Sequence, residues 1–294
     1  MFKTVIYKLE GVLINREILT LKQYEILWQH LRRRKEWKNF SQLMGTREKL
    51  SRRYNVQDAH LRIAKNYLTE REYHNYQHEI AYYAASQQNV YMRKTPAMGS
   101  IMQVTRYYYK NSLLSGDPEL LQRANKRFRF DHSVRYMEAY RENQQDGGEW
   151  EALQQLLKKS NSEPQEAVLV SDRLDSDIAA ANRMGLYTIQ TRFSSEVKGL
   201  QPQLIREKQY FESHTRVPAY PVVPRQGLQR PDAVARHPEE IIRLLQKAED
   251  KSSGKKMTGE KRDTQQVSVW DELRKNLFPE LEVLQQNRSG KTGS

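Results

Sequence analysis

The fold is decided at residues 2–13, which read Phe2-Lys3-Thr4-Val5-Ile6-Tyr7-Lys8-Leu9-Glu10-Gly11-Val12-Leu13. The run is mainly apolar as far as Tyr7, and charged side chains follow at Lys8 and Glu10 before Gly11. A short apolar run that ends in polar residues and glycine is typical of a buried β-strand. We therefore predict that the chain enters a strand here, with Lys8 and Glu10 near its end.

A second informative segment is residues 166–189. An apolar run from Ala167 to Val170 leads into the polar residues 171–177, small residues at helical spacing follow, and Gly185 precedes another apolar run. This succession predicts a β-α-β passage.

Together these segments resemble the haloacid dehalogenase (HAD) superfamily. Its first motif is Asp-x-Asp-Gly-x-Leu, in which the first Asp attacks phosphorus and the second is general acid and base; Lys8 and Glu10 occupy these positions. Its fourth motif is Gly-Asp-x-x-x-x-Asp before an Ala-rich helix, and Asp172 and Asp177 match the metal-binding acids, with Ser171 in place of Gly.

The other two family motifs are weaker. Ser115, at the end of the predicted strand before Gly116, matches the Ser or Thr whose hydroxyl binds phosphate. The third motif is a Lys shortly before a helix, here predicted over Glu149–Lys158, and the matching stretch 144–148 contains no Lys. Gln144 or a neighbour takes that position, and Arg141 is a candidate substitute.

The resemblance implies an α/β fold with a Rossmann-like parallel sheet flanked by helices, an inserted helical cap and a C-terminal extension. An ammonium group at position 8 can neither attack phosphorus nor hold Mg²⁺. We therefore expect a pseudoenzyme with no catalytic residue, cofactor or bound metal. Our hypothesis is that Lys8 replaces the metal and the missing Lys by an internal ion pair with Asp172 and Asp177.

The same resemblance predicts the domain organisation. The α/β core comprises residues 1–13 and 96–248, and a helical cap comprises residues 14–95. A polar linker covers residues 249–267, and a short amphipathic docking helix covers residues 268–286. Residues 192–230 contain four of the ten prolines and predict a long loop.

Charge distinguishes this chain from an ordinary metabolic phosphatase. Its 294 residues carry a net charge of +13, which favours an anionic or acidic partner. Residues 14–95 contain 16 Lys and Arg against 8 Asp and Glu. The densest run predicts partner contacts through basic and aromatic side chains, namely Arg32, Arg33, Arg34, Lys35 and Trp37. That pattern suits RNA or DNA, or an acidic protein surface.

The C-terminal segment predicts a second contact. Ser268 and Asp271 suit a helix start, and an apolar stripe follows, formed by Trp270, Leu273, Leu277 and Phe278. A helix this short needs a surface to dock on, either another protein or the chain's own core.

Three function classes stay open. The first is a catalytically inactive HAD-like subunit that binds other proteins through the cap, the 192–230 loop and the C-terminal helix. The second is a nucleic-acid or ribonucleoprotein-binding module that uses the basic cap. The third is an atypical phosphohydrolase that uses Mg²⁺ with Glu10, Ser115, Asp172 and Asp177. The chain has no cysteine, which excludes disulfides and thiol chemistry. No apolar run is long enough to cross a membrane and no signal peptide is evident, so we expect a cytoplasmic protein.

Overall fold

A computed structural model of the chain describes residues 1–14, 17–54, 59–87, 92, 94–95, 97–140, 148–192 and 227–252. The chain divides into two compact units, one of residues Phe2–Leu245 and one of Met1 with Gln246–Ser294. The elements below belong to the larger unit, except that the helix α11 (Glu240–Ser252) continues from the larger unit into the smaller one.

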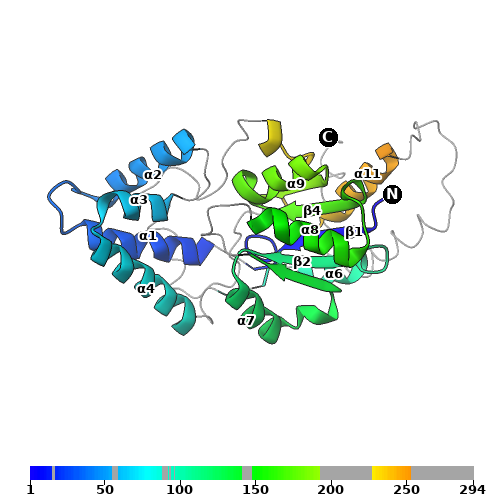
Figure 1. Cartoon of the computed structure of the whole chain (residues 1–294), viewed down its shortest axis with the longest axis horizontal. Coiled ribbons are helices and arrows are strands. Elements are labelled where there is room, and N and C mark those ends of the chain that lie inside the picture. Colours follow the sequence, from blue (N-terminus) through cyan, green and yellow to red (C-terminus); the bar gives the residue numbers. More distant parts are fainter. Residues whose placement is uncertain are drawn as a thin grey trace, which may run out of the picture. The chain divides into compact units, whose positions relative to one another are not determined.

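The core is a six-stranded parallel sheet with the order β3-β2-β1-β4-β5-β6 (Figure 1). Its strands are β1 (Thr4–Lys8), β2 (Lys110–Ser115), β3 (Tyr136–Ala139), β4 (Ala167–Ser171), β5 (Tyr187–Thr191) and β6 (Ala233–Ala235). Every residue of β1 and β4 is buried, as expected for central parallel strands that are covered on both faces. The predicted α/β fold class is confirmed.

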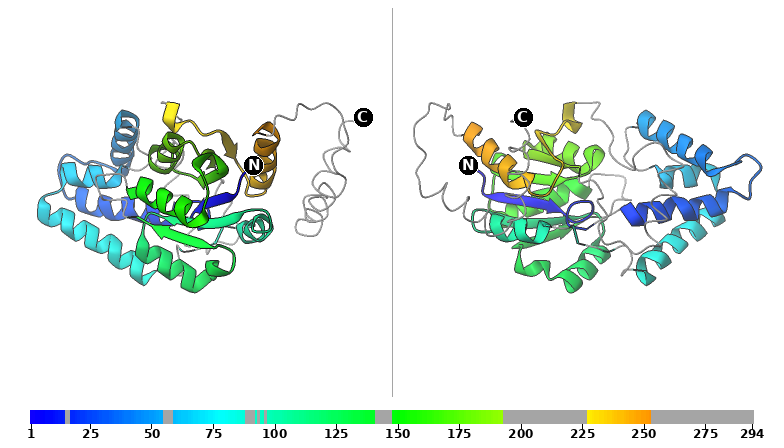
Figure 2. Two further views of the ribbon diagram at one scale, coloured as in Figure 1. Left: turned by 45° about the vertical axis from the view of Figure 1, so that its right-hand side comes forward. Right: turned by 180° about the vertical axis from the view of Figure 1, so that it is seen from behind.

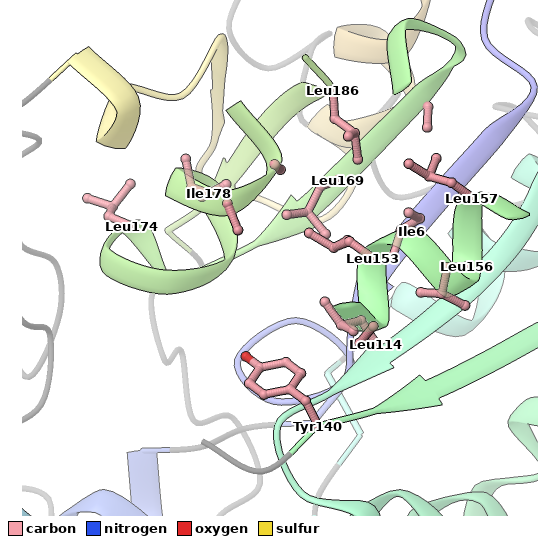
Figure 3. Close-up of a cluster of buried hydrophobic side chains, with 14 residues drawn as sticks. Ile6, Leu114, Tyr140, Leu153, Leu156, Leu157, Leu169, Leu174, Ile178 and Leu186 are labelled. Carbon is pink, nitrogen blue, oxygen red and sulfur yellow. The ribbon is translucent and has the colours of Figure 1, made fainter. Parts of the chain in front are cut away.

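Helices connect the strands. They are α6 (Met98–Thr105), α7 (Pro118–Phe128), α8 (Gly148–Ser160) and α9 (Ala179–Met184), and a π-helical turn over Leu174–Ile178 precedes α9. One face of the sheet packs against α8 and α9 through an apolar cluster (Figure 3). In it, Leu153 and Leu156 of α8 and Ile178 join Ile6, Leu114 and Leu169 of the sheet. The cluster holds β1 in place, and therefore fixes Lys8 at its end.

The chain order reverses across β1. From β1 the chain moves outward through β2 and β3, then returns over the sheet to β4, β5 and β6. In open α/β sheets, sites form beyond the carboxyl ends of the strands at such a switch point. The topology therefore places the site beyond Lys8, the last residue of β1.

Between β1 and α6, the described residues contain four helices, which form the cap. They are α1 (Glu17–Leu31), α2 (Phe40–Tyr54), α3 (His60–Tyr67) and α4 (Glu70–Ser86), which appear in blue and cyan in both views of Figure 2. They enclose their own apolar core, which includes Leu27, Leu31, Leu43 and Ile63. The helices α3 and α4 are separate because Thr69 forms a capping box with Glu72 and starts α4.

The predicted C-terminal features lie largely outside the described residues. The helix α11 extends past Ala248, the predicted end of the core, to Ser252. Three predicted features are not among the described residues. They are residues 253–267 of the linker, the docking helix with Trp270, Leu273, Leu277 and Phe278, and residues 193–226 of the predicted loop. At the end of that loop, Gly227–Gln229 form a 3-10 turn. Within the described part of the chain, no helix is both long and apolar enough to cross a membrane.

Candidate functional site

The candidate site forms where four parallel strands end side by side. Lys8 ends β1, Ser115 ends β2 and Ser171 ends β4, while Tyr140 directly follows β3. The register aligns these ends, since Lys8 pairs with Leu114 and Tyr7 pairs with Val170. Side chains from distant parts of the sequence therefore meet at one edge of the sheet.

Lys8 is the centre of the site. Its side chain is fully buried, and Nζ donates to the Tyr140 hydroxyl at 2.6 Å. The same Nζ lies 3.4 Å from Asp177 Oδ1 and 3.7 Å from Glu10 Oε2. It also lies 4.3 Å from the centroid of the Tyr140 ring. A buried ammonium requires this kind of compensation, and the expected ion pair with Asp177 is present.

Asp177 is held from several sides. Its Oδ1 accepts a 2.5 Å hydrogen bond from the Tyr140 hydroxyl, and its Oδ2 accepts one of 2.7 Å from Ser171 Oγ. The Ser171 oxygen in turn accepts from the backbone N–H of Arg173 at 3.1 Å. Charge-assisted bonds such as these are short and directional, so the carboxylate is fixed in place.

Glu10 faces a different pair of donors. Its Oε1 accepts a 2.6 Å hydrogen bond from Ser115 Oγ and a 3.1 Å bond from the backbone N–H of Gly116. The Glu10 side chain is buried. Ser115 is the residue whose counterpart in the HAD pattern binds phosphate, so a carboxylate of the chain itself takes the hydroxyl that the pattern assigns to substrate.

Asp172 lies against the backbone of Gly11. Gly11 adopts φ +77°, and a Cβ atom at this residue would come within 2.2 Å of Asp172 Oδ2. Asp172 is itself buried. Glycine is needed at position 11 both for its positive φ and for the close approach of this carboxylate.

One other titratable group of β1 is shielded from the site's chemistry. Tyr7 is fully buried, and its hydroxyl forms a 2.9 Å hydrogen bond with Thr105 Oγ1 on α6. Burial raises the pKa of Tyr7 well above its usual range, so the phenol stays neutral. Neighbouring side chains of a strand point to opposite faces, so Tyr7 points away from the face of Lys8. It contributes instead to the packing of α6 on the sheet.

The structure brings together four predicted positions, Lys8, Glu10, Ser115 and Asp177, through the contacts given above. Gln144 and Arg141 lie outside the described residues. Tyr140 was not predicted from the sequence, because the spacing of the third motif from the helix at Glu149 points to residues 144–148 instead. The strand β3, which ends just before Tyr140, is short and half-buried, so no apolar run marks its end in the sequence.

The basic run of the cap is only partly available to a partner. Arg32, Arg33 and Lys35 are exposed, whereas Arg34 pairs with Glu72. Trp37, predicted as a partner contact, is buried in the cap core, with its ring edge-on to Tyr67 at 5.0 Å. The prediction for Trp37 is therefore wrong: the aromatic ring interleaved with basic residues serves helix packing.

Comparison with known proteins supports the same architecture. Residues 149–195 match a family model described as HAD-hydrolase-like. This chain has a HAD-like fold. The match covers α8, β4 with the turn that carries Asp172 and Asp177, α9 and β5. Among curated proteins, none matches the sequence.

Solved structures extend the HAD-like likeness over most of the chain. A HAD-like family hydrolase from Streptococcus pneumoniae is 12% identical with a TM-score of 0.54, covering 83% of this chain and 98% of its own. A predicted phosphoglycolate phosphatase from Haemophilus somnus is 17% identical with a TM-score of 0.52, over 83% and 98%. A HAD-superfamily hydrolase from Geobacter sulfurreducens is 14% identical with a TM-score of 0.50, over 83% and 96%. At such identities the likeness concerns the fold.

The HAD resemblance implies Mg²⁺, but the residues present do not fit it. Mg²⁺ requires near-octahedral oxygen ligands at about 2.0–2.1 Å. Here the Lys8 ammonium lies between the carboxylates of Asp177 and Glu10, and Asp177 is already bonded by Tyr140 and Ser171. A divalent cation beside this ammonium would be repelled by it.

Proposed function

We propose that this chain is a catalytically inactive HAD-like protein that serves as a binding or structural subunit of a larger assembly. The observation that carries the proposal is the burial and bonding of the Lys8 side chain. It stands at the position of the attacking Asp, is fully buried and binds Tyr140 and Asp177. An amine engaged in this way provides no carboxylate nucleophile.

The position of Glu10 supports the same conclusion independently. Its carboxylate accepts from Ser115 and Gly116, two donors that a phosphoryl oxygen would need. To reach these donors, a phosphate would have to displace the buried, hydrogen-bonded carboxylate of Glu10. It would also have to approach the other carboxylates of the site, which carry the same sign of charge. Lys8 thus takes the role of the cation, and Glu10 takes the role of the phosphate.

The net charge and the additional segments support the binding role. A charge of +13 favours association with acidic or anionic surfaces, and Arg32, Arg33 and Lys35 of the cap are exposed. The HAD-like core needs none of the residues after α11, yet these include the apolar stripe from Trp270 to Phe278. Such a stripe requires a surface that covers it.

The inactive state is tested by an assay with an aryl phosphate and Mg²⁺. The natural protein is expected to show no turnover above that of an Asp172→Asn, Asp177→Asn double variant. Lys8→Asp alone is expected not to restore turnover, because Glu10 still binds Ser115 and Gly116. Mg²⁺-dependent hydrolysis by the natural sequence that Asp172→Asn abolishes would refute the inactive state.

The subunit role is tested by association in native lysate. In size-exclusion chromatography, the full-length protein is expected to elute at an apparent mass well above that of a monomer. A chain that lacks residues 251–294 is expected to elute as a folded monomer. Trp270→Ala with Leu277→Ala should have the same effect, since a buried aromatic anchor commonly contributes about 2 kcal/mol or more to an interface. The triple variant Arg32→Ala, Arg33→Ala, Lys35→Ala tests separately whether the exposed basic residues of the cap contribute to the association. Monomeric elution of the full-length chain would contradict the proposal.

A further inference from the structure

A second surface lies at the opposite edge of the sheet, where β2 and β3 begin. Two segments meet there, one formed by the end of α6 and the turn that follows it, the other by the residues after α7. Arg106 Nη1 donates to the backbone oxygen of His132 at 2.9 Å, and Gln103 Nε2 donates to Ser133 Oγ at 3.0 Å. Arg129 Nη2 also donates to the His132 ring, 2.8 Å away. We call this the amino-edge surface; it comprises Arg106, Tyr107, Arg127, Arg129, His132 and Arg135.

The amino-edge surface is strongly positive. Arg106, Arg127, Arg129 and Arg135 are all exposed, as is the neighbouring Lys126. In the described stretch 120–136, Asp131 is the one carboxylate, and it lies 3.5 Å from Arg129. Toward β1 the edge is balanced, since Lys3 pairs with Glu166 at 2.7 Å. The excess positive charge is therefore local to the beginnings of β2 and β3.

Helix electrostatics accounts for only part of this charge. Lys126 and Arg127 lie in the last turn of α7, where the helix dipole favours cations. Arg106 is the C-cap residue of α6, where the same effect applies. Arg135 belongs to neither helix end, so the dipole does not explain it. Arg129 adopts the left-handed conformation, with φ 53° and ψ 48°, that glycine adopts more readily. An arginine is therefore held at a position that the backbone alone would give to glycine.

Aromatic rings accompany these arginines. Tyr107 is 70% exposed, and the Arg106 guanidinium lies 5.4 Å from its ring centroid. The guanidinium of Arg135 lies 5.7 Å from the ring of Tyr136. Exposed planar groups beside cations suit unpaired bases, which stack on rings and guanidinium planes while cations meet the phosphates. An acidic peptide would use the cations and leave the planar groups unused.

We propose that the amino-edge surface binds single-stranded nucleic acid through its phosphates and bases. The proposal does not depend on the site around Lys8, because that site lies at the carboxyl ends of the strands. It also differs from the predicted contact through the cap, which uses another part of the chain.

The test is fluorescence anisotropy of the full-length protein with labelled oligouridine and oligothymidine at several salt concentrations. Arg106→Ala, Arg129→Gly, Arg135→Ala is expected to weaken binding on the order of tenfold and to reduce the salt slope by about 0.7 per lost phosphate contact. The matched control removes three exposed cap charges, Arg32→Ala, Arg33→Ala, Lys35→Ala, and should change binding much less. Tyr107→Ala should weaken binding without changing the salt slope, because stacking releases no counterions.

Arg129→Gly alone separates binding from folding. It relieves the left-handed conformation, so the melting temperature should not fall while affinity does. Binding of either oligonucleotide with this pattern supports the proposal, and preference between the two identifies RNA or DNA. The proposal is overturned if neither oligonucleotide binds, if the cap control loses as much affinity as the amino-edge variant, or if poly-glutamate of equal charge binds as tightly.

Discussion

Lys8→Met is expected to lower the free energy of unfolding by about 3–5 kcal/mol. The Lys8 side chain is fully buried, and its Nζ lies within 4 Å of carboxylate oxygens of Asp177 and Glu10. Methionine fills a similar volume but leaves both carboxylates buried without their cation. Removing one member of a buried ion pair is costly because the remaining charge stays desolvated. Urea unfolding at neutral pH measures the loss.

Two controls separate this cost from a general effect of losing a lysine. Lys22→Met removes a partly exposed pair with Glu25, 2.8 Å long, and is expected to cost only about 0.5 kcal/mol or less. Combining Lys8→Met with Asp177→Asn should recover part of the loss, since one of the two unpaired charges is removed. If Lys8→Met costs no more than Lys22→Met, Lys8 has no structural role at the site.

The sequence predicted much of the core, for a physical reason. The strands β1 and β4 are buried, mainly apolar runs that end in Lys8 and Ser171, while in β2 only Leu113 and Leu114 are apolar before Ser115. Parallel strands bring such ends to one edge of the sheet. The ion pair between Lys8 and Asp177 followed from charge compensation. The bond between Glu10 and Ser115 was not predicted, because the family pattern assigns the Ser115 hydroxyl to substrate and gives no sign that a carboxylate of the chain accepts from it.

Two local misreadings have a common origin. Residues 136–139 are half-buried throughout and form no apolar run, so the end of β3 was not a reference point and Tyr140 was missed. In the cap, basic residues beside Trp37 predict a contact surface, whereas its ring packs in the cap core. Composition records that an aromatic ring lies beside cations; the packing of several helices decides which way it points.

Gly11→Ala is expected to lower the free energy of unfolding by about 2–5 kcal/mol. The backbone of Gly11 has φ +77°, which costs a non-glycine residue about 1–2 kcal/mol. The added Cβ would also come within 2.2 Å of Asp172 Oδ2, so a buried carboxylate must move, and overpacking of this kind costs about 1–3 kcal/mol more. Urea unfolding measures the total.

The matched control is Gly185→Ala at the end of α9. Gly185 has φ +89°, but a Cβ there meets nothing within 4 Å, so its substitution reports backbone strain alone, about 1–2 kcal/mol. In an Asp172→Ala background, the cost of Gly11→Ala should fall toward that of Gly185→Ala, because the obstructing carboxylate is gone. Equal costs for the two glycines in the natural background would mean that Asp172 does not lie against Gly11.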